Sequence, residues 1–287
     1  MSTVQIEVRE SGSKLVGLHR KLMAGQWGDI DWRGFDRGKF SPESLRYSAE
    51  AWRRRLADEY RSATVFSQFQ SFLLLTNLPV DILGCASRVV QDEVRHVQLC
   101  ADLVAVMGED MTAEIYEPAL FVPFDTESEA APQLLSLTIG LFCMGETVSS
   151  HLIGATYEKT GHPLVKEAMK RLYSDEQFHA EFGWNLAAVL AQHVEPGVLE
   201  AIGAGLDQSF GELETMCTSY GEGADDMVLT DEDRLLGSLS VPEHRACFYQ
   251  AVDSELVPRL EKMGFPARAK WEAREIGATP AAMPAHD

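Results

Sequence analysis

The sequence lacks a long uninterrupted hydrophobic run. Its richest apolar stretches are interrupted by Gln, Ser, Asp or Glu before they reach the length of about 18 residues that a membrane-spanning helix needs. The first residues, MSTVQIEVRESGSKLVGLHRK, also lack the apolar core of a secretory signal. We therefore expect a soluble, cytoplasmic protein without a membrane partner.

Basic residues and paired cysteines are scarce as well. Lys and Arg number 25 against 44 Asp and Glu, which gives a formal net charge of −19. A chain this acidic repels phosphate backbones, so a nucleic-acid partner is not expected. The five cysteines are odd in number, widely spaced and free of any Cys-x-x-Cys pair. Reduced, mostly buried thiols fit this pattern better than a disulfide framework or a zinc site.

Strand patterns are absent, whereas apolar residues recur at steps of three and four. The chain has 287 residues, 45% of them hydrophobic, which suffices for one large domain or two small ones. We predict an all-α fold with helices over about 43–76, 79–107, 132–159, 163–193, 197–219 and 242–263.

Turn residues divide these helices into hairpins. Thr76-Asn77-Leu78-Pro79 separates the first pair, and Thr160-Gly161-His162-Pro163 separates the second. The acidic segment 108–131 joins the two hairpins as a long crossover. This wiring is that of a ferritin-like four-helix bundle. We expect an irregular N-terminal arm (1–42), a helical domain (43–276) with its core bundle at 43–194 and two additional C-terminal helices, and a disordered tail (277–287).

Two Glu-x-x-His motifs carry the chemistry. Glu93 and His96 lie in the second predicted helix, and Glu176 and His179 lie in the fourth. This spacing places a carboxylate and an imidazole on one helical face, one turn apart, as a metal ion requires. A lone motif is most simply a solvated polar face. Two copies, the first embedded among valines and leucines, predict a buried metal site, because charge in an apolar stripe must be neutralised.

Hairpin geometry identifies one further Glu on each remaining helix. Residues at equal height in an antiparallel pair lie equally far in sequence from the turn, and Glu146 and Glu176 have their midpoint at Gly161. Glu59 and Glu93 have theirs at Thr76. Glu146 is the only acid in a strongly apolar segment. Glu59 has Asp58 and Glu50 nearby, so a solvated surface position is the alternative for it. Four carboxylates and two imidazoles suit two iron ions, with manganese or an iron–manganese pair as alternatives.

With these residues the sequence resembles the ferritin-like di-iron carboxylate superfamily, over about residues 43–194. The order Glu, Asp-Glu-x-Arg-His, Glu, Asp-Glu-x-x-His is similar to that of its oxygen-activating members, such as the bacterial multicomponent monooxygenases. The resemblance implies that Asp92 and Asp175 hydrogen-bond the far nitrogen of the histidine on the opposite helix, and that Arg95 ties down one of these acids. Surface salt bridges are the alternative role for these three residues.

The resemblance also implies an oxygen and substrate pocket. Ser150 lies one turn after Glu146, where the monooxygenases carry a hydroxyl, and Thr147 is beside it; a helix-interior Ser bonded to its own backbone is the alternative. A tyrosyl-radical subunit is disfavoured because Cys100 occupies the position of the radical Tyr. The expected pocket lining is partly apolar and includes Phe66, Phe142 and Cys143.

Two functions fit such a chain. The first is an oxygenase or oxidase that uses O2 to oxidise a small organic substrate, for example in a tailoring step of specialised metabolism, with electrons from a ferredoxin or another reductase. The second is a ferroxidase or iron-storage subunit. The additional arm and C-terminal helices favour the enzyme, because they would obstruct packing into a cage. A homodimer is one of the assemblies that the sequence allows.

Overall fold

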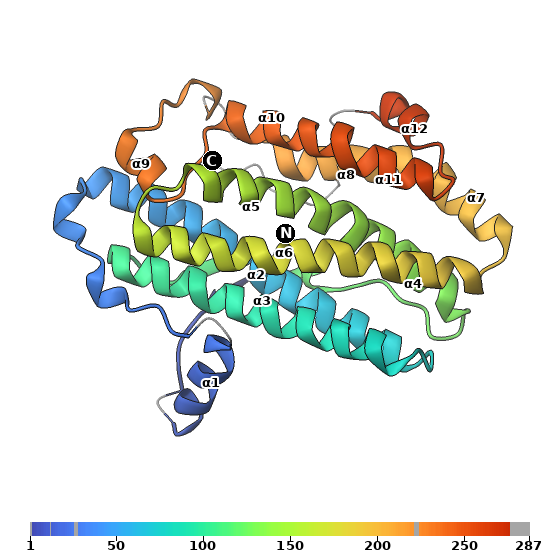
Figure 1. The fold of residues 1–287 in the computed structure, drawn as a ribbon, viewed down its shortest axis with the longest axis horizontal. Coiled ribbons are helices and arrows are strands. Elements are labelled where there is room, and N and C mark those ends of the chain that lie inside the picture. The colour runs from blue at the N-terminus through green and yellow to red at the C-terminus, as the bar shows by residue number, and fades with distance from the viewer. Residues whose placement is uncertain (1, 12, 26–27, 221–223, 276–287) are drawn as a thin grey trace.

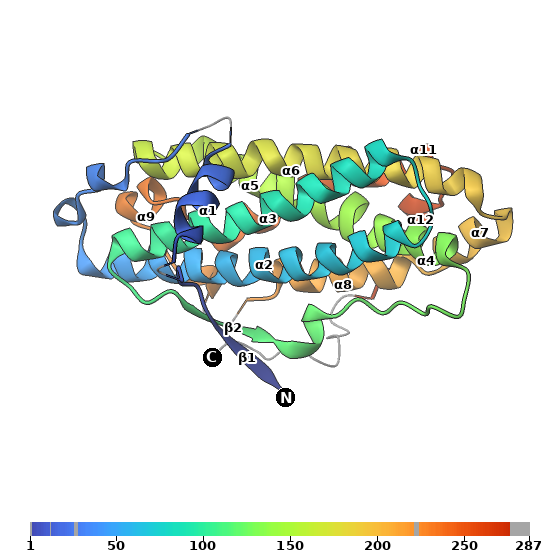
Figure 2. The same cartoon turned by 90° about the horizontal axis from the view of Figure 1, so that it is seen from below.

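The computed structural model describes residues 2–11, 13–25, 28–220 and 224–275, which are mainly helical. Four long helical segments lie alongside one another (Figures 1 and 2). They are α2 (Pro42–Leu74), α3 (Val80–Met107), the continuous run of α4 (Ala130–Leu137), η4 (Thr138–Glu146) and α5 (Thr147–Lys159), and α6 (Pro163–Leu190). Packing of α2 against α3, and of η4 and α5 against α6, forms two hairpins. The predicted helical fold is confirmed.

The local sequence explains where these helices begin and end. Pro42 and Pro163 stand in the first turns of α2 and α6, where a missing N–H costs nothing. The Ser41 side chain caps α2 by accepting a hydrogen bond from the N–H of Ser44. Gly108, at a φ of 88°, ends α3 in the left-handed conformation that glycine adopts readily.

The expectation that the chain has no strand was wrong. Strands β1 (Thr3–Glu7) and β2 (Thr112–Tyr116) form an antiparallel ribbon in which Thr3 pairs with Tyr116 (Figure 2). Such a pairing of two five-residue segments far apart in sequence leaves little local pattern. The arm is also less irregular than expected. Besides β1 it contains α1 (Leu15–Ala24), η1 (Trp32–Gly34) and η2 (Arg37–Lys39).

The C-terminal part forms an additional layer, which packs on α5 (Figure 1). The first predicted C-terminal helix is divided at Gly205, and the second is one continuous run; two short helices, α9 and α12, were not predicted. The layer comprises α7 (Pro196–Ala204), α8 (Leu206–Thr218), α9 (Asp231–Leu235), α10 (Val241–Ala251), η7 (Val252–Leu256), α11 (Val257–Lys262) and α12 (Ala267–Ala273). The short turns η3 (Glu117–Leu120), η5 (Ala191–His193) and η6 (Ala224–Asp226) complete the described chain.

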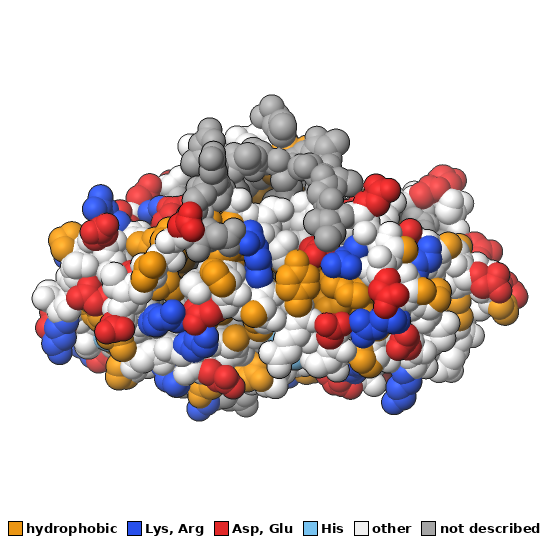
Figure 3. Space-filling model, turned by 90° about the horizontal axis from the view of Figure 1, so that it is seen from above, with side chains coloured by type: hydrophobic (Ala, Val, Ile, Leu, Met, Phe, Trp, Pro, Cys, Tyr) orange, Lys and Arg blue, Asp and Glu red, His pale blue; other side chains and the backbone are white. Residues whose placement is uncertain are grey.

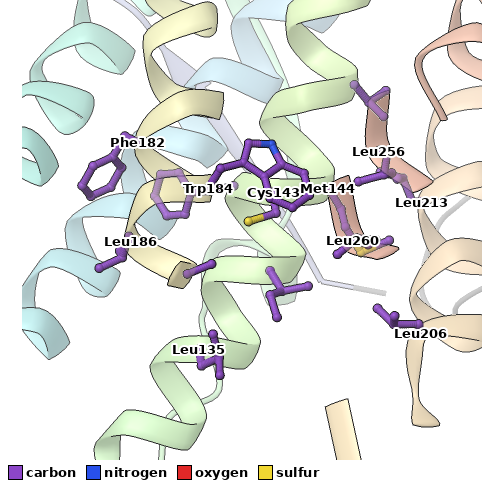
Figure 4. Packing of buried hydrophobic residues seen from close by; sticks show 14 of the residues in the cluster. Leu135, Cys143, Met144, Phe182, Trp184, Leu186, Leu206, Leu213, Leu256 and Leu260 are labelled. Carbon is purple, nitrogen blue, oxygen red and sulfur yellow. The ribbon is translucent and has the colours of Figure 1, made fainter. Parts of the chain in front are cut away.

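The outer face seen from above this layer mixes acidic, basic and apolar side chains (Figure 3). The inner side is apolar. Side chains of α8, η7 and α11 gather beside Cys143, Met144 and Trp184 (Figure 4). The predicted disordered tail, 277–287, lies outside the described residues. Among the described helices, none combines the length and the apolar character that crossing a bilayer requires.

The core consists of two apolar clusters with a polar layer between them. Along α2 one cluster includes Leu56 and the other begins at Val65. Along α6 the first ends at Leu172 and the second begins at Phe182. Both predicted Glu-x-x-His motifs fall in the gaps between the clusters, so the fold surrounds the polar layer with hydrocarbon on two sides.

Candidate metal centre

The structure brings all six predicted ligands together in the polar layer. None of the six is more than 7% exposed. They come from α2 (Glu59), α3 (Glu93 and His96), the junction of η4 and α5 (Glu146), and α6 (Glu176 and His179). Charged side chains are rarely buried to this extent unless they are paired or bind an ion.

These residues form two overlapping quartets. In each quartet one ligand atom per residue lies within 4.8 Å of the others, so each quartet could hold a metal ion. Glu93 and Glu176 belong to both quartets, which makes them the residues able to bridge two ions. The quartets are Glu59, Glu93, His96 and Glu176, and Glu93, Glu146, Glu176 and His179.

The histidines point a ring nitrogen into each quartet. His96 Nδ1 lies 3.2 Å from Glu59 Oε2 and 3.4 Å from Glu176 Oε1. His179 Nδ1 lies 3.1 Å from Glu93 Oε1 and 3.4 Å from Glu146 Oε2. The two imidazole rings are 5.7 Å apart between their centroids, so the two halves of the centre are neighbours.

Several of these buried atoms lack a hydrogen-bond partner among the described residues. They are Oε2 of Glu93, Oε2 of Glu146, Oε2 of Glu176 and both ring nitrogens of His179. Nε2 of His179 faces Asp92, outside the quartet. The other four atoms belong to the residues of one quartet, and because an unsatisfied buried polar atom costs free energy, they need a common partner. A cation supplies one. The donor set, oxygen-rich with two imidazoles, fits iron or manganese better than a metal that prefers thiolates.

Burial and neighbouring charges shift the pKa values of the carboxylates in the centre. Burial raises the pKa of Glu59 to about 7. Burial and the adjacent Glu146 raise the pKa of Glu176 well above its ordinary value. Burial alone would raise the pKa of Glu93, but the imidazoles of His179 and His96 outweigh it and bring the pKa to about 2. Without a metal ion, Glu59 and Glu176 therefore stay protonated to a higher pH than exposed glutamates do.

Both outer acids lie near a histidine of the opposite helix, but only Asp175 makes the hydrogen bond that the resemblance implies. Asp175 Oδ2 lies 3.4 Å from His96 Nε2, and Asp92 Oδ2 lies 3.5 Å from His179 Nε2. Each acid thus stands behind the histidine of the opposite helix. Arg95 contacts both acids rather than one, with its Nη1 3.0 Å from Asp92 Oδ1 and 3.0 Å from Asp175 Oδ2. Its Nε donates to the carbonyl of Met23 at the end of α1.

Arg88 is a participant that we did not predict from the sequence. Its Nε donates to Asp92 at 3.1 Å, and its Nη2 donates to Asp175 at 3.4 Å. The sequence spacing could have identified it, because Arg88, Asp92 and Arg95 stand at i, i+4 and i+7 on α3 and so share one face. The partner acid on α6 could be identified only from the fold.

The predicted pocket residues occupy different surroundings. Thr147 is buried, and its hydroxyl accepts a hydrogen bond from Trp184 Nε1 at 3.0 Å. Ser150 is half-buried in α5. The rings of Phe66 and Phe142 stack with centroids 4.5 Å apart, which places both in the apolar core.

The two predicted cysteines are buried too. Burial raises the pKa of Cys100 well above its ordinary value, and nearby Glu59 adds to the shift. Cys143 lies in the core against the C-terminal layer. One cleft, of about 310 Å³, lies between η4 and α7–α8, and a smaller one lies beneath the arm; none of the six predicted pocket residues lines either cleft.

The segment before Glu146 has an unusual backbone. η4 is π-helical over nine residues, Thr138–Glu146. Wide π turns inside α-helices occur frequently at functional sites, because they shift the side chains that follow. The site thus combines six buried ligand-type residues, two outer carboxylates and two arginines, an arrangement suited to holding two adjacent cations. Comparisons of the chain with protein-family models, curated proteins and solved structures find no match.

Proposed function

We propose that this protein is a ferritin-like di-iron enzyme that activates O2 to oxidise a small organic substrate. The observation that supports this most strongly is the pair of overlapping quartets, each with one imidazole and three carboxylates, sharing Glu93 and Glu176. A single ion would need only one quartet. Two quartets with shared carboxylates are the arrangement that a dinuclear site requires.

Each ligand then has a defined task. Glu59 and His96 would hold one ion, Glu146 and His179 the other, and Glu93 would bind both together with Glu176. A reduced iron pair would supply electrons and Lewis acidity to O2. Four carboxylates balance the charge of two divalent ions, so burial of the loaded centre carries a smaller electrostatic cost than burial of the empty one.

The surrounding residues orient the ligands and exclude water. Asp175 accepts from the outer nitrogen of His96, which leaves Nδ1 available as the metal-facing lone pair. The apolar clusters on both sides of the layer keep bulk water away, which strengthens electrostatic interactions inside. Thr147 follows Glu146 in the chain, and its buried hydroxyl is held by Trp184 Nε1.

The C-terminal layer supports an enzyme over an iron-storage subunit. α8, α10 and α11 cover the helical segment that carries Glu146, and their outer face carries charged side chains of both signs among apolar ones (Figure 3). This layer occupies a side of the bundle that a cage subunit would use for packing. The proposed partners are O2, an organic substrate and an electron donor such as a ferredoxin or its reductase.

The proposal is tested by metal content and by the fate of oxygen. Reduced, iron-loaded protein is exposed to 18O2 with candidate substrates, and O2 uptake is compared with labelled product. Glu176→Gln should lose metal and product formation. Glu181→Gln is the matched control, because this acid lies on the same helix but is 60% exposed at its side chain. Catalytic oxidation of a large excess of Fe(II) with deposition of a ferric core, and no organic product, would identify a ferroxidase instead.

A further inference from the structure

Behind the two histidines, two carboxylates and two arginines form a compact group. The side chains of Asp92 and Asp175 are 1% and 2% exposed, yet they face each other across α3 and α6. One oxygen of each acid lies 3.0 Å from the same atom, Arg95 Nη1, and two buried anions so close repel each other unless cations stand between them. Arg95 supplies one cation and Arg88 the other.

The two arginines differ in how they are held. Arg95 is nearly buried, with a side chain 11% exposed, and the carbonyl of Met23 fixes its position. Arg88 is 46% exposed and lies over the ring of Phe178, with 3.8 Å between its guanidinium carbon and the ring centroid. Stacking on Phe178 holds the guanidinium beside both acids. Its planar fork can then contact two carboxylates at once.

We propose that Arg88 is a positioning residue that helps to orient the histidine ligand in each half of the metal centre. It acts through Asp175 on His96 and through Asp92 on His179. The inference rests on the metal centre proposed above and deepens it by naming a second residue, besides Arg95, that contacts both outer acids.

Removing Arg88 should therefore lower the affinity for both metal ions, whereas removing one outer acid should mainly lower the affinity for one of them. Loss of an outer hydrogen-bond partner typically lowers metal affinity 10–100-fold. Because Arg95 stays in place, we expect Arg88→Gln to lower each of two stepwise affinities by roughly tenfold, the lower end of that range. Asp92→Asn should affect chiefly the step at His179.

The experiment is a titration of metal-free protein with Co2+, followed by visible absorbance. It yields stepwise affinities and a ligand-field spectrum that reports on how the histidines are oriented. The matched control is Arg268→Gln, since Arg268 is 41% exposed and forms an ion pair of 2.7 Å with Asp253, remote from the centre in sequence and fold. We expect the Arg88→Gln spectrum to change and the Arg268→Gln spectrum to match the native one.

Arg88→Lys provides a second variant. A lysine ammonium is a point charge and contacts one carboxylate at a time, so at least one binding step should remain weaker than in the native protein. Native affinities and spectra in both Arg88 variants would overturn the assignment. If the native protein itself binds no Co2+, the proposed metal centre fails; if it binds two and Arg88→Gln matches Arg268→Gln, only the role of Arg88 fails.

Discussion

Replacing Glu59 with Gln should make the metal-free protein more stable while impairing its metal binding. Glu59 is 7% exposed, and its Oε2 lies 3.2 Å from His96 Nδ1. Burial raises its pKa from 4.5 to about 7. A neutral Gln of the same shape removes the cost of ionising this group in the folded state.

The magnitude follows from linkage between protonation and folding. A folded-state pKa above the unfolded value means that the folded chain binds the proton more tightly, so stability is lost as pH rises through 7. At about 1.4 kcal/mol per pKa unit, ionised Glu59 costs about 3 kcal/mol at pH 8. At pH 5.5 the same relation gives only about 1 kcal/mol, because the folded state is then still protonated.

The assay is urea unfolding of chelator-treated protein at pH 5.5 and pH 8, followed by circular dichroism. Glu59→Gln should have the higher free energy of unfolding at both pH values, by about 1 kcal/mol at pH 5.5 and about 3 kcal/mol at pH 8. Asp58→Asn is the matched control, because the adjacent acid is 71% exposed and its removal should change stability little at either pH.

The opposite sign would refute the reasoning. If Glu59→Gln is less stable than the native protein at pH 8, the contact between Glu59 and His96 outweighs the cost of burying the charge, and the raised pKa inferred for Glu59 is wrong. A stability gain that does not grow between pH 5.5 and pH 8 would exclude ionisation of Glu59 as its source. Adding metal should make the native protein the more stable of the two, since only it keeps all the ligands of the His96 half.

Three further outcomes are expected. Glu176→Gln should leave less than about one ion per chain by elemental analysis because Glu176 serves both quartets, whereas Glu146→Gln should keep about one; equal losses would refute separate halves. Asp175→Asn should weaken metal affinity roughly 10–100-fold with unchanged helix content, and an unaltered affinity would show that this acid does not orient its histidine. Gly183→Ala would place a Cβ 2.3 Å from the Cβ of Phe142 and should cost about 1–3 kcal/mol in urea unfolding. A neutral effect there would mean that η4 and α6 can separate freely.

Much of the centre could be predicted from the sequence because its information is local. Glu93 and His96, like Glu176 and His179, are separated by one helical turn, and that spacing determines a shared face wherever the helix lies. Glu146 could be found because hairpin symmetry relates it to Glu176 through the turn at Gly161. All of these expectations depend only on helix geometry and on turn chemistry that proline and glycine make explicit.

Other features were decided by tertiary packing. The β1–β2 ribbon joins five-residue segments whose partners are far apart in sequence, so no window contains both strands. The layer formed by α8, α10 and η7 over η4 and α5 depends on which apolar faces meet, and composition does not specify that.

The electrostatic surroundings of the centre also needed the fold. The sequence by itself determined that Arg88, Asp92 and Arg95 share a face of α3, because helical spacing alone requires it. Only the tertiary structure placed Asp175 of α6 against that face, and so gave both arginines a second buried carboxylate to hold. The physical reason is range: backbone geometry acts over one or two turns, whereas a buried charge is balanced by whichever group the packing of distant helices brings within a few ångströms.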